Sequence, residues 1–179
     1  MPFVIWFTGI PASGKSTIAK AVEDRLKRMG LKVERLESDS LRKILTPRPQ
    51  YTEEERDWFY GVIAWLAYLL YRNDVNVLID ATAHKAMYRE KARQLIGKDF
   101  IEVYVKCPIE IAMKRDTKGL YKKALEGIIK TLPGLQVPYE EPVSPDIVLD
   151  TSVESVEDCA EKVLTLLRRR GYLPNTRLL

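Results

Sequence analysis

The sequence is poor in the residues that build covalent or metal-linked frameworks. It contains two cysteines, Cys107 and Cys159, and one histidine, His84, among 179 residues. The cysteines lie far apart without C-x-x-C spacing, so neither a disulfide framework nor a zinc site is expected, and both are predicted to be buried thiols. The lone histidine is expected to be a hydrogen-bonding residue rather than a catalyst.

The sequence also lacks long uncharged apolar runs and a strong excess of charge of one sign. No apolar stretch reaches about 18 residues without a charge, so no membrane-spanning helix is expected. Residues 1–7 pass directly into an apolar strand pattern without a basic segment, which argues against secretion and predicts a cytoplasmic location. Charged residues make up 30% of the chain with closely mixed signs and a net charge of +4, so a nucleic-acid partner is not expected.

What is present is the composition of an ordinary globular chain, 46% of it hydrophobic. We predict one domain over residues 1–179. Strand patterns alternate with helical patterns: strands are expected at residues 3–8, 32–36, 75–79, 100–105 and 147–149, and helices at residues 16–29, from 52 onward and at 156–167. This βαβ repetition predicts a three-layer α/β fold with a mostly parallel five-stranded sheet.

Two parts of the chain carry further expectations about structure. The helix that begins at Thr52 repeats large apolar residues at intervals of three and four, and these are expected to face the core: Trp58, Val62, Trp65, Leu66 and Leu69. Between residues 117 and 145 the periodicity weakens, basic residues crowd together and prolines become frequent. This segment is predicted to be a lid, with Lys122 and Lys123 closing over bound nucleotide, followed by an extended stretch.

Residues 9–17 read GIPASGKST and match the P-loop motif G-x-x-x-x-G-K-[ST], placed after a buried strand and before a helix. Such a loop wraps its backbone N–H groups around phosphates, and its lysine reaches the β and γ phosphates of a nucleotide. The Ser16 hydroxyl suits Mg²⁺. The motif therefore predicts a P-loop NTPase fold that binds ATP and Mg²⁺, with nucleotide contacts from Gly9, Ala12, Ser13, Gly14, Lys15, Ser16 and Thr17.

A P-loop alone does not separate kinases from GTPases, motor ATPases or regulatory modules. The guanine-reading element N-K-x-D of GTPases is absent from the sequence. Asp39 follows the second expected strand, where it could hold an acceptor hydroxyl and take its proton or, alternatively, cap a helix. Arg42 could bind an anionic acceptor. Asp80 ends the third expected strand and could hold the water shell of Mg²⁺ or merely cap a turn.

Four stretches resemble the adenylylsulfate (APS) kinases. Residues 115–124 read RDTKGLYKKA, which is similar to that family's lid motif, and residues 5–9 (IWFTG), 138–140 (PYE) and 150–152 (DTS) continue the likeness over nearly the whole chain. The family transfers phosphate from ATP to the 3′-hydroxyl of adenosine 5′-phosphosulfate (APS), giving PAPS, with Mg²⁺ required and dimers common. The resemblance therefore implies a sulfate-activating kinase with APS as its small-molecule partner, and a homodimer.

The same resemblance implies roles for individual residues. Asp39 would be catalytic and Arg115 would bind the nucleotide. The catalytic role of Lys15 and the metal roles of Ser16 and Asp80 rest on the P-loop motif and on the position of Asp80 at the end of a strand. The residues implied to contact the acceptor are Asp39, Arg42, Tyr51, Arg56, Lys118, Gly119, Leu120 and Leu132.

The chain departs from the family pattern mainly on the acceptor side. Glu37 stands for an aspartate, Phe59 for an asparagine, and Leu132 for the phenylalanine that helps to cover the acceptor's adenine. Two alternatives therefore stay open from the sequence. One is a kinase of the same fold that acts on another small hydroxyl compound or on aminoacyl-tRNA. The other is a regulator or inactive partner domain that binds ATP without turnover.

Overall fold

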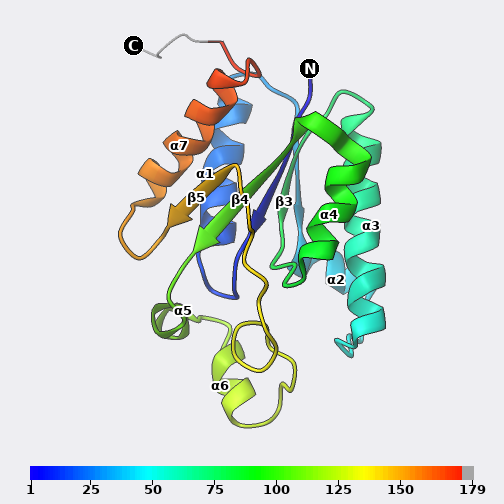
Figure 1. Ribbon diagram of the computed structural model, residues 1–179, viewed down its shortest axis with the longest axis vertical. Coiled ribbons are helices and arrows are strands. Elements are labelled where there is room, and N and C mark those ends of the chain that lie inside the picture. The colour runs from blue at the N-terminus through cyan, green and yellow to red at the C-terminus, as the bar shows by residue number, and fades with distance from the viewer. Residues whose placement is uncertain (175–179) are drawn as a thin grey trace.

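The computed structural model describes residues 1–174 and has a five-stranded sheet at its centre (Figure 1). The strands lie in the order β2-β3-β1-β4-β5, and every pairing between them is parallel. Their bounds are β1 (Val4–Thr8), β2 (Val33–Glu37), β3 (Asn76–Asp80), β4 (Phe100–Lys106) and β5 (Ile147–Asp150). The predicted α/β class and the five strands are confirmed.

Helices cover both faces of the sheet and form the three layers that the alternating pattern predicts (Figure 1). One face carries α1 (Lys15–Arg28) and α7 (Val156–Arg169), and the other carries α3 (Glu53–Tyr71) and α4 (Ala86–Ile96). β1 lies in the middle because its residues are apolar on both faces. Ile5 and Phe7 belong to the core beneath α1 and α7, whereas Val4 and Trp6 belong to the core beneath α3 and α4.

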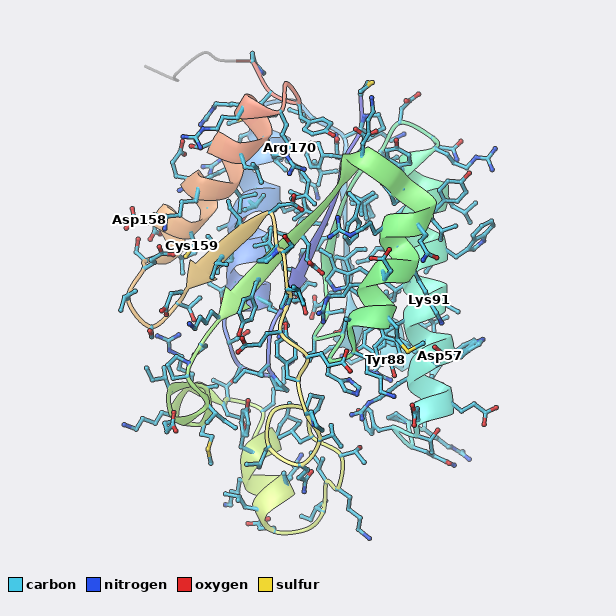
Figure 2. The ribbon with its side chains drawn as sticks, in the orientation of Figure 1. Asp57, Tyr88, Lys91, Asp158, Cys159 and Arg170 are labelled. Carbon is cyan, nitrogen blue, oxygen red and sulfur yellow. The ribbon has the colours of Figure 1, made fainter. Side chains whose placement is uncertain are left out.

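The expectation about the buried face of α3 is wrong for its two tryptophans, whereas Leu66 is half-buried and packs against this core. Trp58 and Trp65 are 51% and 49% exposed, and the side chains that pack against the sheet include Phe59, Ile63 and Ala67. Both sets of residues repeat at helical spacing, so periodicity alone could not choose between them. The face that meets the sheet combines the aromatic residues Phe59 and Tyr60 with the small residues Ala64 and Ala67. The outer side of α3 is joined to α4 by an ion pair of 2.7 Å between Asp57 and Lys91 (Figure 2).

Beyond the carboxyl ends of the strands the chain forms several short elements whose bounds the sequence did not indicate. They are α2 (Ser38–Leu45), α5 (Ile109–Arg115) and α6 (Leu120–Leu125). The 3₁₀ turn η1 (Gly97–Asp99) lies at the opposite edge of the sheet, where it leads into β4. The segment at residues 117–145 thus begins with a helix and has a small apolar core of its own, to which Cys107, Tyr121 and Leu132 belong. Both cysteines are buried, as predicted, with Cys159 on α7 (Figure 2). Among the described helices, none has the length and apolar character needed to cross a membrane.

A buried arginine fastens the extended segment to the sheet. Arg89 on α4 is 1% exposed, and its Nε lies 2.9 Å from Oε2 of Glu102 on β4. Its other nitrogens donate to the carbonyl of Ala83, at 2.5 Å, and to the carbonyl of Glu140, at 2.8 Å. One guanidinium therefore joins the loop after β3, strand β4 and the extended segment that leads to β5.

Arg89→Met should destabilise the chain strongly. The change leaves Glu102 buried without its main counter-charge and removes the donor from two carbonyls, which typically costs about 3–5 kcal/mol in the free energy of unfolding. Arg93 lies 3.5 Å from the other Glu102 oxygen but is one third exposed, so it is a weak substitute. Denaturant unfolding of both proteins measures the difference.

Arg28→Met is the matched control, because Arg28 is an exposed arginine in the last turn of α1. Its loss should change the free energy of unfolding by less than about 1 kcal/mol. Similar losses in the two variants would show that the buried position of Arg89 has no special importance.

Candidate active site

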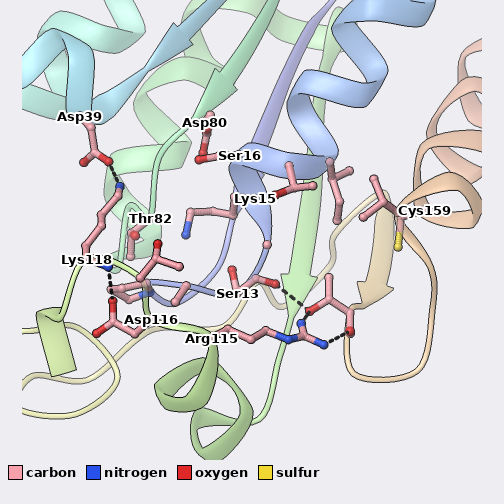
Figure 3. A pocket seen from close by; sticks show the side chains of 18 of the residues that line it. Ser13, Lys15, Ser16, Asp39, Asp80, Thr82, Arg115, Asp116, Lys118 and Cys159 are labelled. Carbon is pink, nitrogen blue, oxygen red and sulfur yellow. Dashed lines mark hydrogen bonds and ion pairs between the residues drawn. The ribbon is translucent and has the colours of Figure 1, made fainter. Parts of the chain in front are cut away.

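A cleft of about 560 Å³ opens at the carboxyl edge of the sheet, beside the P-loop (Figure 3). It is formed where β1, β2 and β3 end and where the lid begins, the edge at which open α/β sheets bind ligands. The cleft is lined by eleven of the residues that the sequence singled out: Ala12, Ser13, Gly14, Lys15, Ser16, Thr17, Asp39, Asp80, Arg115, Lys118 and Leu120.

The P-loop needs glycine at two positions for different reasons. A Cβ on Gly9 would lie 2.4 Å from the carbonyl oxygen of Val105, so a side chain there would collide with the backbone of β4. Gly14 has φ +103° and is the N-cap of α1, a left-handed conformation that favours glycine. These two positions let the chain turn from a buried strand into a helix whose N-terminus faces the cleft.

Lys15 lies at the start of α1 and is almost completely buried. Its ammonium donates to the carbonyls of Gly9 and Ile10, both at 2.9 Å, so the loop holds its own lysine in place. Burial lowers the pKa of Lys15 to about 8, and the negative charge of Asp80 opposes this shift. The side chain is therefore still a cation at neutral pH, with little margin.

Asp80 ends β3 and is 2% exposed. Burial raises the pKa of this carboxyl group, whereas Lys15, the Ser16 hydroxyl and Arg35 act in the opposite direction. Nη1 of Arg35 lies 3.3 Å from Oδ2 of Asp80. Asp80 is the last residue of the strand, and Arg35 forms an ion pair with it.

These residues fit Mg²⁺. Residues 1–174 contain no group of three or more His, Cys, Asp or Glu side chains that could hold a metal ion. Mg²⁺ does not require such a cage, because it keeps several waters and is usually held through one or two carboxylates together with the substrate phosphates. A hydroxyl from Ser16 and a carboxylate from Asp80, both lining the same cleft, are hard oxygen donors of the appropriate kind.

Asp39 lies in the first turn of α2, and its surroundings differ from those of a capping residue. The N-cap of α2 is Glu37, and no side chain caps that helix. The carboxylate of Asp39 instead forms an ion pair with Lys118, which reaches it from the segment predicted to be a lid (Figure 3). This contact brings together two predicted site residues that are 79 positions apart in the sequence.

Two residues that the site prediction omitted hold the P-loop by hydrogen bonds to its backbone carbonyls. Thr151 donates through Oγ1 to the carbonyl of Ser13, at 2.7 Å, while its own carbonyl accepts from Arg115 at 2.8 Å (Figure 3). Tyr121 on α6 donates to the carbonyl of Pro11, at 2.7 Å. Arg115 is thereby fixed at the cleft by the loop after β5. The only sequence signal for Thr151 and Tyr121 was their place in the family-like stretches.

The remaining acceptor-side residues form a cluster next to the cleft rather than in its lining. The guanidinium of Arg42 lies 3.9 Å from the ring centre of Phe59 and 4.9 Å from that of Tyr51. The guanidinium of Arg56 lies 5.5 Å from the same Tyr51 ring, and it donates to the carbonyl of Thr131 at 2.8 Å. Phe59, where the family has an asparagine, therefore supports Arg42 by cation–π contact.

Other predicted residues lie elsewhere. Leu132 is 5% exposed within the small core of the lid, and Lys122 and Lys123 are exposed on α6. Gly119 is the N-cap of α6, with φ +68°. His84 is buried, and burial lowers the pKa of its imidazole to about 4, so it is neutral at physiological pH.

Over residues 1–150 the chain matches the adenylylsulphate kinase family. It is 42% identical to the adenylyl-sulfate kinase of Halothermothrix orenii over 169 residues, which are 94% of this chain and 91% of that protein. It is 46% identical to the probable adenylyl-sulfate kinase of Archaeoglobus fulgidus over 151 residues, which are 84% of this chain and 97% of that protein.

Solved structures agree with these relatives. The chain is similar to the APS kinase of Mycobacterium tuberculosis in complex with AMPPNP and APS, with a TM-score of 0.88, 34% identity and coverage of 94% of this chain and 99% of that one. A gluconokinase from Sinorhizobium meliloti, at 19% identity and a TM-score of 0.65, shares the fold alone. The family match, the relatives and the P-loop cleft lead to one conclusion: the chain belongs to the adenylylsulphate kinase family.

Proposed function

We propose that the cleft beside the P-loop is where this chain transfers the γ-phosphoryl group of ATP to the 3′-hydroxyl of adenosine 5′-phosphosulfate. The chain is an adenylyl-sulfate kinase by family, with ATP as phosphoryl donor and Mg²⁺ as metal. The observation that carries the assignment of the site is the meeting of Lys15, Asp39 and Asp80 in one cleft, although they come from three separate elements, α1, α2 and β3.

The donor end of the reaction belongs to the P-loop. Lys15 is held by two carbonyls and keeps its charge at neutral pH, so it can follow the β and γ phosphates during transfer. The N-terminus of α1 adds backbone N–H groups that face the same space. Ser16 and Asp80 would hold Mg²⁺, which when bound neutralises charge on the phosphate oxygens.

The acceptor end belongs to Asp39 and Lys118. The Asp39 carboxylate is about half exposed, so it is open to a hydroxyl from the cleft side, and its ion pair with Lys118 places a cation beside it. A carboxylate in this position can orient the 3′-hydroxyl toward the γ-phosphorus and accept its proton. Lys118, together with the cluster of Arg42 and Arg56, can bind the anionic groups of APS.

Nucleotide affinity should fall as the pH rises above about 8, because the pKa of Lys15 is lowered to about 8. Below this value the ammonium is charged and attracts phosphate, and above it the charge is progressively lost. Titration of ADP from about pH 7.5 to about pH 9.5, where the charge of the nucleotide is constant, should show the dissociation constant rising by up to tenfold per pH unit. The Lys15→Ala variant should bind ADP weakly, with a dissociation constant that does not change with pH. If its dissociation constant rises with pH as steeply as that of the original chain, a group other than Lys15 causes the pH dependence.

Asp39→Asn should lower kcat on the order of 10²–10⁴-fold, because an amide can neither accept the proton nor supply negative charge. The lower end is expected if the carboxylate mainly positions the hydroxyl, since phosphoryl transfer proceeds through a loose transition state. The measurement is kcat and KM for APS at saturating Mg-ATP, with a thermal melt to verify folding.

Asp24→Asn is the matched control, because Asp24 is a surface carboxylate on α1 paired with Lys20. It should leave both kinetic constants within about twofold of the original chain. If folded Asp39→Asn keeps more than about a third of kcat, the catalytic role of Asp39 is refuted.

The acceptor is tested by comparing turnover of APS with that of a panel of hydroxylated metabolites, using release of ADP as the common signal. APS should exceed every other compound in kcat/KM. ADP binding without turnover of any acceptor would instead support the alternative of a regulatory ATP-binding protein. The homodimer and the cytoplasmic location stay predictions from the sequence.

A further inference from the structure

Behind the cleft, one arginine on β2 lies among three carboxylates. Nε of Arg35 is 2.9 Å from Oε2 of Glu23 on α1, and its Nη1 is 3.2 Å from Oε2 of Glu37 and 3.3 Å from Oδ2 of Asp80. The arginine side chain is 18% exposed, and the carboxylates of Glu23 and Asp80 are 10% and 3% exposed. Arg35 therefore lies in a largely desolvated position, where ion pairs depend strongly on geometry.

The two ends of this guanidinium contact different parts of the fold. Its Nε end contacts Glu23, which also accepts from Lys27 at 2.6 Å, so α1 fixes that end of the arginine. Its Nη1 end contacts Glu37 and Asp80, which are register partners on adjacent strands β2 and β3. The contact with Glu23 is enough to join β2 to α1. The contacts of Nη1 with Glu37 and Asp80 therefore have a different effect, which concerns the carboxylates at the edge of the cleft.

That effect concerns two negative charges that lie side by side at the edge of the sheet. Glu37 and Asp80 are like charges that repel each other, and Nη1 of Arg35 lies between them, 3.2 Å from Oε2 of Glu37 and 3.3 Å from Oδ2 of Asp80. Lys15 is the other cation that acts on Asp80, but its ammonium is directed to the carbonyls of Gly9 and Ile10. The Ser16 hydroxyl also acts on Asp80, but Arg35 is the cation that forms an ion pair with its carboxylate.

We propose that Arg35 is a positioning residue for the kinase reaction, which holds the carboxylate of Asp80 in the orientation that serves Mg²⁺ beside Ser16. The proposal rests on the proposed function of the cleft, and it assigns no direct contact between Arg35 and the substrates. Groups that orient the ligands of a metal typically change metal affinity or activity by 10–100-fold when they are removed.

The test compares Arg35→Met with the original chain by titrating ADP in the presence of Mg²⁺ and again in EDTA. Calorimetry gives both dissociation constants, and their ratio measures the gain in ADP affinity that depends on the metal. Arg35→Met should reduce this gain about 10–100-fold while changing the affinity in EDTA by less than about threefold. In turnover, kcat should fall while KM for APS stays close to its original value.

Two control variants separate positioning from general effects of the substitution. Arg72→Met removes an arginine that caps the far end of α3 and stacks on Tyr68, and it should leave the gain unchanged. Glu23→Gln keeps an oxygen that accepts from Nε of Arg35, so it should retain most of the gain even if it lowers the melting temperature. Arg35→Lys keeps the charge but loses the planar fork that contacts several carboxylates, and it should lose the gain at least severalfold.

The proposal is overturned if a folded Arg35→Met protein keeps the gain within about threefold of the original, because Arg35 would then serve stability alone. If Arg35→Met does not fold, the Mg²⁺-dependent gain in ADP affinity is compared between Arg35→Lys and Glu23→Gln instead. An equal gain in these two variants overturns the proposal. The binding measurement needs no acceptor. Failure of the original chain to phosphorylate APS would therefore refute the proposed function and leave the result for Arg35 standing.

Discussion

The tight passage from β1 into α1 is the constraint on which the rest of the site depends. The backbone at Gly9 runs so close to β4 that a Cβ would lie 2.4 Å from the carbonyl oxygen of Val105. This approach turns the loop carbonyls toward Lys15 and points the first turn of α1 at the cleft. Thr151, in the loop after β5, and Tyr121, on α6, then hold the P-loop through hydrogen bonds to its carbonyls. A rigid phosphate site is the result, and phosphoryl transfer depends mainly on such positioning.

Charge balance is the second organising feature of the cleft. Lys15 and Asp80 are both buried there, and each one moderates the pKa shift that burial imposes on the other. On β2, Arg35 forms ion pairs with Asp80 and with Glu37, so positive and negative charges continue to alternate there. Farther out, Asp39 and Lys118 form another pair of opposite charges. Around the buried Lys15 and Asp80, this arrangement keeps charged groups available in a poorly solvated space, which would otherwise favour their neutral forms.

The acceptor side shows how a departure from the family pattern is accommodated. Phe59 stands where the family resemblance implies an asparagine, and its ring lies under the guanidinium of Arg42 and supports it by cation–π contact. Arg56 reaches the carbonyl of Thr131, next to Leu132, so the acceptor cluster is continuous with the lid. The family resemblance could give the identity of these residues but not this arrangement, because it arises from contacts between segments far apart in the chain.

The sequence by itself determined the strand and helix alternation, the P-loop and the likeness to one kinase family, because these depend on local spacing and on a motif with its own geometry. Only the tertiary structure decided which face of α3 is buried, since both faces carry apolar residues at helical spacing. It also decided that Asp39 pairs with Lys118 instead of capping α2, and that Arg35 joins Glu23, Glu37 and Asp80. The physical reason is the same in each case: side chains with several equivalent local options are fixed by partners that are distant in sequence and that only the folded sheet brings close.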